Sequence, residues 1–124
     1  MIITHDFQAP RNLFEKLLRD AGSLEVEING DNVFNFITTA HFLRDWIKKS
    51  PLSESEVSKR FLRRVAKDPN FKVCVDIINH SKPFSITLDE NNKHRFIDLG
   101  DSKIDVLLFR DEITELYNVY FKMK

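Results

Sequence analysis

The chain has 124 residues, 42% hydrophobic and 31% charged, with 19 basic and 19 acidic side chains and a net charge of zero. These values predict one globular domain over residues 1–124, while only three glycines disfavour turn-rich barrels and no glycine-rich phosphate loop occurs. One cysteine, no leader pattern and no apolar run of membrane-spanning length predict a cytoplasmic protein without a membrane partner.

The first predicted helix spans about residues 9–21. Pro10 suits a first turn, where its missing N–H is not needed, and apolar residues then recur at helical spacing. Gly22 suits a C-terminal cap that would end the helix. Residues 23–28 alternate apolar and polar side chains as in a strand, but a loop or an extra helical turn fits them equally well.

The second predicted helix, about residues 32–49, is the best-marked element. Asp31 can cap its first turn, and Ser50 followed by Pro51 ends it. One stripe of the helix is apolar and is expected to face the core; it comprises Val33, Phe36, Ile37, Ala40, Leu43 and Ile47. Trp46 lies at the edge of this stripe and is predicted to anchor the core.

Two shorter helices are predicted next. The third spans about residues 54–67 and begins with a capping box formed by Ser53 and Glu56. The fourth spans about residues 70–82 and ends before Pro83.

The pattern changes to strands after the fourth helix. Residues 85–88 and 95–99 alternate with period two around a polar turn. Residues 104–109 fit a third, buried strand or the start of a long last helix, and we predict a strand followed by a helix at about 111–122, capped by Asp111. The expected fold is mainly α (α+β), a bundle of four to five helices with a small antiparallel hairpin or three-stranded element before the C-terminal helix.

Histidine and aspartate recur four residues apart on the polar faces of two predicted helices. His41 and Asp45 lie on the second helix, and Asp76, Asn79 and His80 lie on the fourth. If these helices are neighbours, the five side chains could line one cleft for general acid–base catalysis, because a carboxylate orients an imidazole and raises its basicity. The alternative is that each face is solvated surface. Neither spacing is a metal-binding signature, and we predict no metal or other cofactor.

Positive charge is concentrated in residues 48–72, which hold eight basic and three acidic residues. Their net charge of +5 leaves −5 for the rest of the chain. The third helix presents five cations on one side, and these could contact the phosphates of a nucleic acid or form a solvated face; they are Lys59, Arg60, Arg63, Arg64 and Lys67.

The aromatic and small residues add weaker indications. Eleven phenylalanines indicate an aromatic-rich core or a buried interface, and Trp46 with the edges of Phe34 and Phe42 could bind a small molecule. Cys74 and Ser81 are placed inside the apolar stripe of the fourth helix. We therefore expect them to allow close packing and not to act as nucleophiles.

Two stretches of the chain resemble a known group of proteins. Residues 35–47 (Asn-Phe-Ile-Thr-Thr-Ala-His-Phe-Leu-Arg-Asp-Trp-Ile) are similar to an N-F-x-x-T-A-x-H-L-x-D-W pattern with the histidine shifted by one place. Residues 74–82 (Cys-Val-Asp-Ile-Ile-Asn-His-Ser-Lys) are similar to C-x-D-I-x-N-x-S-K-H, with Pro83 in place of the last histidine. Both patterns resemble an uncharacterised group of small bacterial helical proteins found in phages, integron gene cassettes and other mobile elements.

A looser similarity links the chain to HEPN domains, helical proteins that include RNases and toxin components. Their hallmark is an arginine that precedes a histidine by four to six residues. Before His80 these positions hold Cys74, Val75 and Asp76, so the RNase motif is not matched.

Two functions are therefore expected from the sequence. The first is a non-enzymatic interaction or regulatory module of a bacterial mobile element, acting as a homo-oligomer or bound to another protein. The alternative is an RNase-like or toxin-like enzyme acting on nucleic acid, with the histidines as general acid or base and the cations of the third helix on phosphate.

Overall fold

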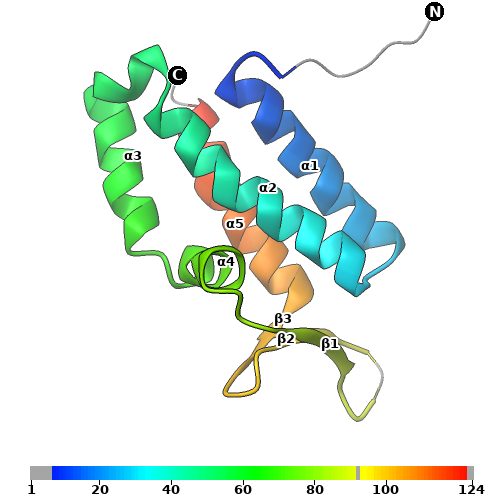
Figure 1. Cartoon of the computed structure of the whole chain (residues 1–124). Helices are drawn as coiled ribbons and strands as arrows, with labels where there is room; N and C mark the ends of the chain where they lie inside the picture. The colour runs from blue at the N-terminus through cyan, green and yellow to red at the C-terminus, as the bar shows by residue number, and fades with distance from the viewer. Residues whose placement is uncertain (1–6, 92, 123–124) are drawn as a thin grey trace, which may run out of the picture.

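Five α-helices and a three-stranded antiparallel sheet make up residues 7–91 and 93–122, the part of the chain described by a computed structural model (Figure 1). This confirms the predicted mainly helical α+β fold, with its small sheet directly before the C-terminal helix. The elements are α1 (Pro10–Val26), α2 (Gly30–Lys48), the 3-10 turn η1 (Pro51–Glu54), α3 (Glu56–Ala66), α4 (Pro69–Asn79), β1 (Ser85–Leu88), β2 (Arg95–Asp98), β3 (Lys103–Asp105) and α5 (Val106–Lys122).

The helices surround α5, the C-terminal helix. In Figure 1, α1 and α2 form an antiparallel pair in front of α5, while α3 lies to one side and α4 is seen nearly end-on below. Apolar stripes from α1, α2 and α5 meet in a continuous core that includes Leu17, Phe36, Ile113 and Tyr117, each fully buried. Burial of these stripes is the main force that holds the helices together.

The sheet lies at the end of the molecule where α5 begins (Figure 1). Its strand order is β1-β2-β3, and Ile97 in the central strand pairs with Ile86 on one side and Ile104 on the other. Ile97 is fully buried and belongs to the core. The sheet therefore closes the lower end of the helical core.

The end of α1 and the start of α2 differ from the sequence predictions. The first helix does not end at Gly22 but continues to Val26, so the extra helical turn, left open for residues 23–28, is what forms. The cap of α2 is Asn29, whose side chain accepts the Asn32 N–H at 2.8 Å, and not Asp31.

The cap of α3 and the end of α4 also differ. Ser55 caps α3 by accepting the Ser58 N–H at 3.1 Å, whereas Ser53 lies within η1. The fourth helix ends at Asn79 and not near residue 82, and Ser81 has a positive φ of 53° outside the helix. Ser81 is exposed, so its predicted place in an apolar helical stripe is wrong.

The strand predicted for residues 104–109 is wrong beyond Asp105. The helix begins at Val106, and the Asp105 carboxylate accepts the Leu108 N–H at 3.0 Å, so Asp105 and not Asp111 caps it. Val106, Phe109 and Ile113 are all buried, and their spacing matches a helical turn and not a strand. Among the described helices, none combines the length and apolarity needed to cross a membrane.

Candidate functional site

The imidazole of His41 is buried, so the solvated face that the sequence left open for this residue does not form. The residue is 2% exposed, and its ring stacks on Phe71 of α4 at 6.0 Å between centroids and lies edge-on to Phe42 at 4.9 Å. Neither ring nitrogen has a hydrogen-bond partner within the described residues. Burial, and secondarily the Arg44 charge, lower the pKa of His41 despite an opposing effect of Asp45.

Asp45 pairs with its neighbour and not with the histidine. Its carboxylate lies 3.2 Å from a guanidinium nitrogen of Arg44, and the Arg44 guanidinium lies over the Phe71 ring at 5.1 Å from the centroid. The predicted orientation of the His41 imidazole by Asp45 is therefore wrong, because no hydrogen bond joins them.

The residues expected on α4 make no hydrogen bond to the His41 imidazole. His80 occupies the C-cap and is exposed, as is Asn79, while Asp76 is half-buried. Phe71, on which His41 stacks, is near the opposite end of α4, and a helical rise over nine residues separates positions 71 and 80 by about 13 Å. The two imidazoles thus lie in different environments, one buried against Phe71 and one exposed at the C-terminal end of α4.

Neither a metal centre nor a reactive thiol is supported by the described residues. In residues 7–91 and 93–122, no three histidine, cysteine or acidic side chains are grouped closely enough to hold a metal ion. Cys74 is fully buried, and this burial raises the pKa of its thiol far above the usual range. Cys74 is therefore a packing residue, as its apolar neighbours in the sequence indicated.

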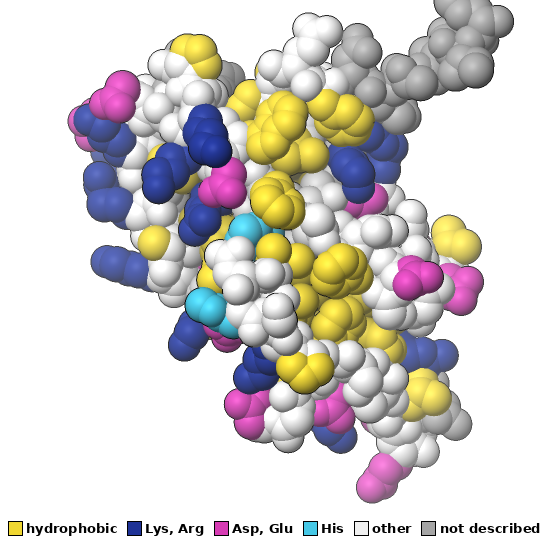
Figure 2. Space-filling view, viewed as in Figure 1, with side chains coloured by type: hydrophobic (Ala, Val, Ile, Leu, Met, Phe, Trp, Pro, Cys, Tyr) yellow, Lys and Arg dark blue, Asp and Glu magenta, His cyan; other side chains and the backbone are white. Residues whose placement is uncertain are grey.

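The five predicted cations of α3 do form one exposed surface, here called the basic face, which consists of Lys59, Arg60, Arg63, Arg64 and Lys67. Figure 2 shows Lys and Arg side chains gathered over this helix. Lys59 lies 3.5 Å from the Glu54 carboxylate, but the other four have no ion-pair partner in the part of the chain described. Most of this positive charge is therefore uncompensated.

A small apolar pocket opens at the edge of the basic face, between α3 and α5, and sequence reasoning missed it. Its volume is about 100 Å³, and it is lined by Val57, Arg60, Phe61, Arg64, Val119 and Tyr120. Two of these residues come from α5, more than 50 positions along the chain from α3, so only the packing of α3 on α5 creates the pocket. We call it the α3–α5 pocket.

Aromatic side chains form a second exposed surface, on α2. Phe34 and Phe42 are 44% and 42% exposed, and Trp46 is half-buried against the edge of the core. With Thr38 they follow one another at intervals of four residues, and we call these four residues the aromatic stripe. Figure 2 shows a band of hydrophobic side chains over α2 and the adjoining side of α1.

Two hollows flank the aromatic stripe. One, of about 290 Å³, lies against Leu13 and Lys16 of α1, and the other, of about 460 Å³, lies against Pro10 and Pro51; both are lined by Phe42 and Trp46. The Phe34 ring also stacks on Phe84 at 6.4 Å. The spacing of these aromatics was visible in the sequence, but their exposure depends on where α1 and α4 leave α2 uncovered.

Comparisons with family models, with curated proteins and with solved structures find no match for this chain. The candidate sites therefore rest on the chain's own geometry. That geometry places the α3 cations on one exposed face, and it leaves His41 buried and His80 exposed. It adds two features, the α3–α5 pocket and the aromatic stripe.

Proposed function

We propose that the protein is a non-enzymatic interaction module that self-associates through the aromatic stripe of α2. The observation that carries this proposal is the exposure of Phe34 and Phe42, which flank Thr38 on one helix face, with Trp46 one turn further on. Contiguous exposed aromatic side chains beside hollows are characteristic of protein–protein interaction sites.

A second copy of the chain is the occupant that the stripe fits best. Its side chains are uncharged and the chain has no net charge, so two copies approach without net repulsion. Residues at four-residue intervals form a ridge that can pack beside an identical ridge on a partner helix. Thr38, the smallest member, leaves a gap between Phe34 and Phe42 that can receive an aromatic ring from the other copy.

The biological setting is proposed from the sequence resemblance. Residues 35–47 include most of the aromatic stripe, and with residues 74–82 they resemble small bacterial helical proteins of phages and gene cassettes. The resemblance supports a cytoplasmic regulatory module carried by a bacterial mobile element. The enzymatic alternative receives no support from His41 and His80, because the first is buried with no hydrogen-bond partner among the described residues and the second is exposed at the C-cap of α4.

Trp46 makes the test direct, because it is the single tryptophan of the chain and lies in the stripe. We expect a dimer at concentrations on the order of tens of micromolar, measured by sedimentation equilibrium, with Trp46 emission shifting to the red on dilution. Phe42→Ser should weaken association by about tenfold or more, since it removes a large aromatic contact.

Leu108→Ser is the matched control, because Leu108 is 57% exposed but lies on α5 and outside the stripe. We expect it to leave the association constant unchanged. A monomer throughout the concentration range contradicts self-association. A dimer that Phe42→Ser leaves intact contradicts the stripe as its interface.

A further inference from the structure

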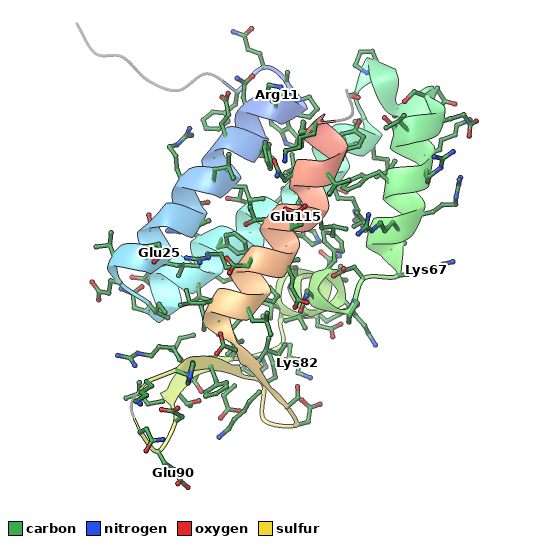
Figure 3. All side chains as sticks on the ribbon, turned by 180° about the vertical axis from the view of Figure 1, so that it is seen from behind. Arg11, Glu25, Lys67, Lys82, Glu90 and Glu115 are labelled. Carbon is green, nitrogen blue, oxygen red and sulfur yellow. The ribbon has the colours of Figure 1, made fainter. Side chains whose placement is uncertain are left out.

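The α3–α5 pocket combines an apolar interior with a cationic rim. Val57, Phe61 and Val119 supply apolar lining, and the guanidinium-bearing Arg60 and Arg64 also line it. Viewed from behind, α3 and α5 run side by side, and side chains from both fill the space between them (Figure 3). The pocket lies outside the aromatic stripe and shares no residue with it.

The interior of the pocket is suited to an aliphatic group. Apart from the two arginines, the one lining residue with a polar side chain is Tyr120. Its hydroxyl forms a buried hydrogen bond of 2.7 Å with the Ser58 Oγ. A cavity of about 150 Å³ can hold benzene, so the volume of about 100 Å³ suits one aliphatic side chain.

The rim of the pocket is suited to carboxylates. Arg60 and Arg64 have no ion-pair partner among the described residues, and Arg63 and Lys67 extend the same unpaired charge along α3. Guanidinium groups bind carboxylates with two parallel hydrogen bonds, which gives such pairs both strength and geometric specificity.

We propose that the α3–α5 pocket is a docking site for an acidic peptide segment of a partner protein. One aliphatic side chain of the segment enters between Arg60 and Arg64, and the flanking carboxylates pair with the two guanidinium groups. This inference goes beyond self-association through α2 and does not depend on it, because the two surfaces use different residues.

The pocket favours a peptide over a nucleic acid. Contacts with phosphates need cations but no apolar cavity, and recognition of single-stranded bases relies on exposed aromatic faces and on hydrogen bonds to base edges. The rings in the lining, Phe61 and Tyr120, are both buried, and they pack on each other at 4.5 Å between centroids. They are therefore not free stacking platforms.

The test is fluorescence anisotropy with three labelled probes and the full chain. The first probe is a short peptide of aspartate and glutamate with one central leucine, the second has serine in place of that leucine, and the third is a single-stranded RNA of equal charge. We expect the leucine peptide to bind about tenfold more tightly than the serine peptide, a gain typical of burying one aliphatic side chain.

Two variants of equal charge locate the site. Arg64→Gln removes a cation that lines the pocket, and Arg63→Gln removes the adjacent cation that does not. We expect Arg64→Gln to weaken binding of the leucine peptide about tenfold and Arg63→Gln to weaken it about twofold. Only Arg64→Gln removes a direct charged hydrogen bond to the peptide.

A third variant, Val119→Gln, keeps every cation and places a polar side chain in the pocket. In this variant we expect the leucine peptide to bind no more tightly than the serine peptide. Circular dichroism checks that the variant is folded. Tighter binding of RNA than of the leucine peptide, insensitive to Val119→Gln, overturns the proposal in favour of nucleic acid. Absence of peptide binding, or equal affinity for both peptides, overturns it as well. None of these outcomes changes the sedimentation result for α2.

Discussion

His41 illustrates how far a single residue can depart from the face on which a helical wheel places it. The wheel puts it away from the apolar stripe of α2, but α4 covers that flank of the helix and Phe71 stacks on the imidazole. A buried imidazole with both nitrogens unpaired disfavours its charged form, which is why its pKa falls. Sequence periodicity describes one helix and carries no information on a second layer that packs behind it.

The lowered pKa of His41 predicts a pH-dependent stability. The unfolded chain takes up a proton at His41 near its ordinary pKa of 6.5, whereas the folded protein does so only at lower pH. The unfolded state therefore binds more protons below about pH 6.5, and the free energy of unfolding decreases as the pH falls through this window. His41→Leu should flatten this part of the curve, measured by urea denaturation across a pH series.

His80→Gln provides the comparison for His41→Leu, since His80 is exposed at the end of α4. It should leave the shape of the stability curve unchanged. If His41→Leu and the unsubstituted protein lose stability in parallel on acidification, the imidazole is not held neutral by burial and the interpretation of its environment is wrong.

At the scale of elements, helix ends were harder to predict than helices. Local signals for caps were present at Gly22, Asp31 and Asp111, and the structure uses none of them. The last helix begins where Val106 and Phe109 can enter the core, and this tertiary burial outweighs the β-like run of residues 104–109. Asp105 becomes the cap because of where burial starts the helix.

A substitution at Gly22 tests whether α1 ends at Gly22 or continues to Val26, because the two cases predict stability changes of opposite sign. Gly22 lies inside α1, and no atom comes within 4 Å of a Cβ added there. Gly22→Ala should therefore raise the free energy of unfolding by about 0.5–1 kcal/mol, because alanine lowers the entropy of the unfolded chain. Urea denaturation measures the change.

Gly100→Ala is the matched control, because Gly100 has a φ of +90° that favours glycine. Although a Cβ there also meets no atom, we expect this substitution to lower the stability. A loss of stability in Gly22→Ala would instead indicate that α1 ends at Gly22 in solution.

On the scale of the whole molecule, the basic face and the aromatic stripe lie on different helices. The basic face covers α3, whereas the aromatic stripe lies on α2 and is uncharged (Figure 2). The chain outside residues 48–72 carries 11 basic and 16 acidic side chains and is therefore net negative. Two different kinds of contact, one ionic and one apolar, can thus be made independently.

Salt should separate these two contacts. Raising NaCl from about 0.1 M to about 1 M shortens the Debye length from about 10 Å to about 3 Å. We expect the acidic peptide to bind the α3–α5 pocket about tenfold more weakly at the higher salt, whereas dimerisation through α2 changes by less than about twofold, because apolar contacts are not screened. Anisotropy and sedimentation follow the two equilibria, and dissociation of the dimer by salt would show that its interface is ionic.

The sequence by itself determined the helices, the position of the small sheet and the basic face of α3, because each depends on residues close together in the chain. Apolar spacing near 3.6 or 2 is a local property, and so is the spacing of cations along one helix.

Only the tertiary structure decided the buried environment of His41, the exposed environment of His80, and the α3–α5 pocket. Each of these depends on which helix covers which flank of another. His41 is buried because α4 packs on α2, and the pocket exists because Val119 and Tyr120 of α5 meet α3. These contacts join residues that are distant in the chain. The hydrophobic effect that stabilises them is non-directional, so the sequence pattern of one helix does not specify which other helix packs on it.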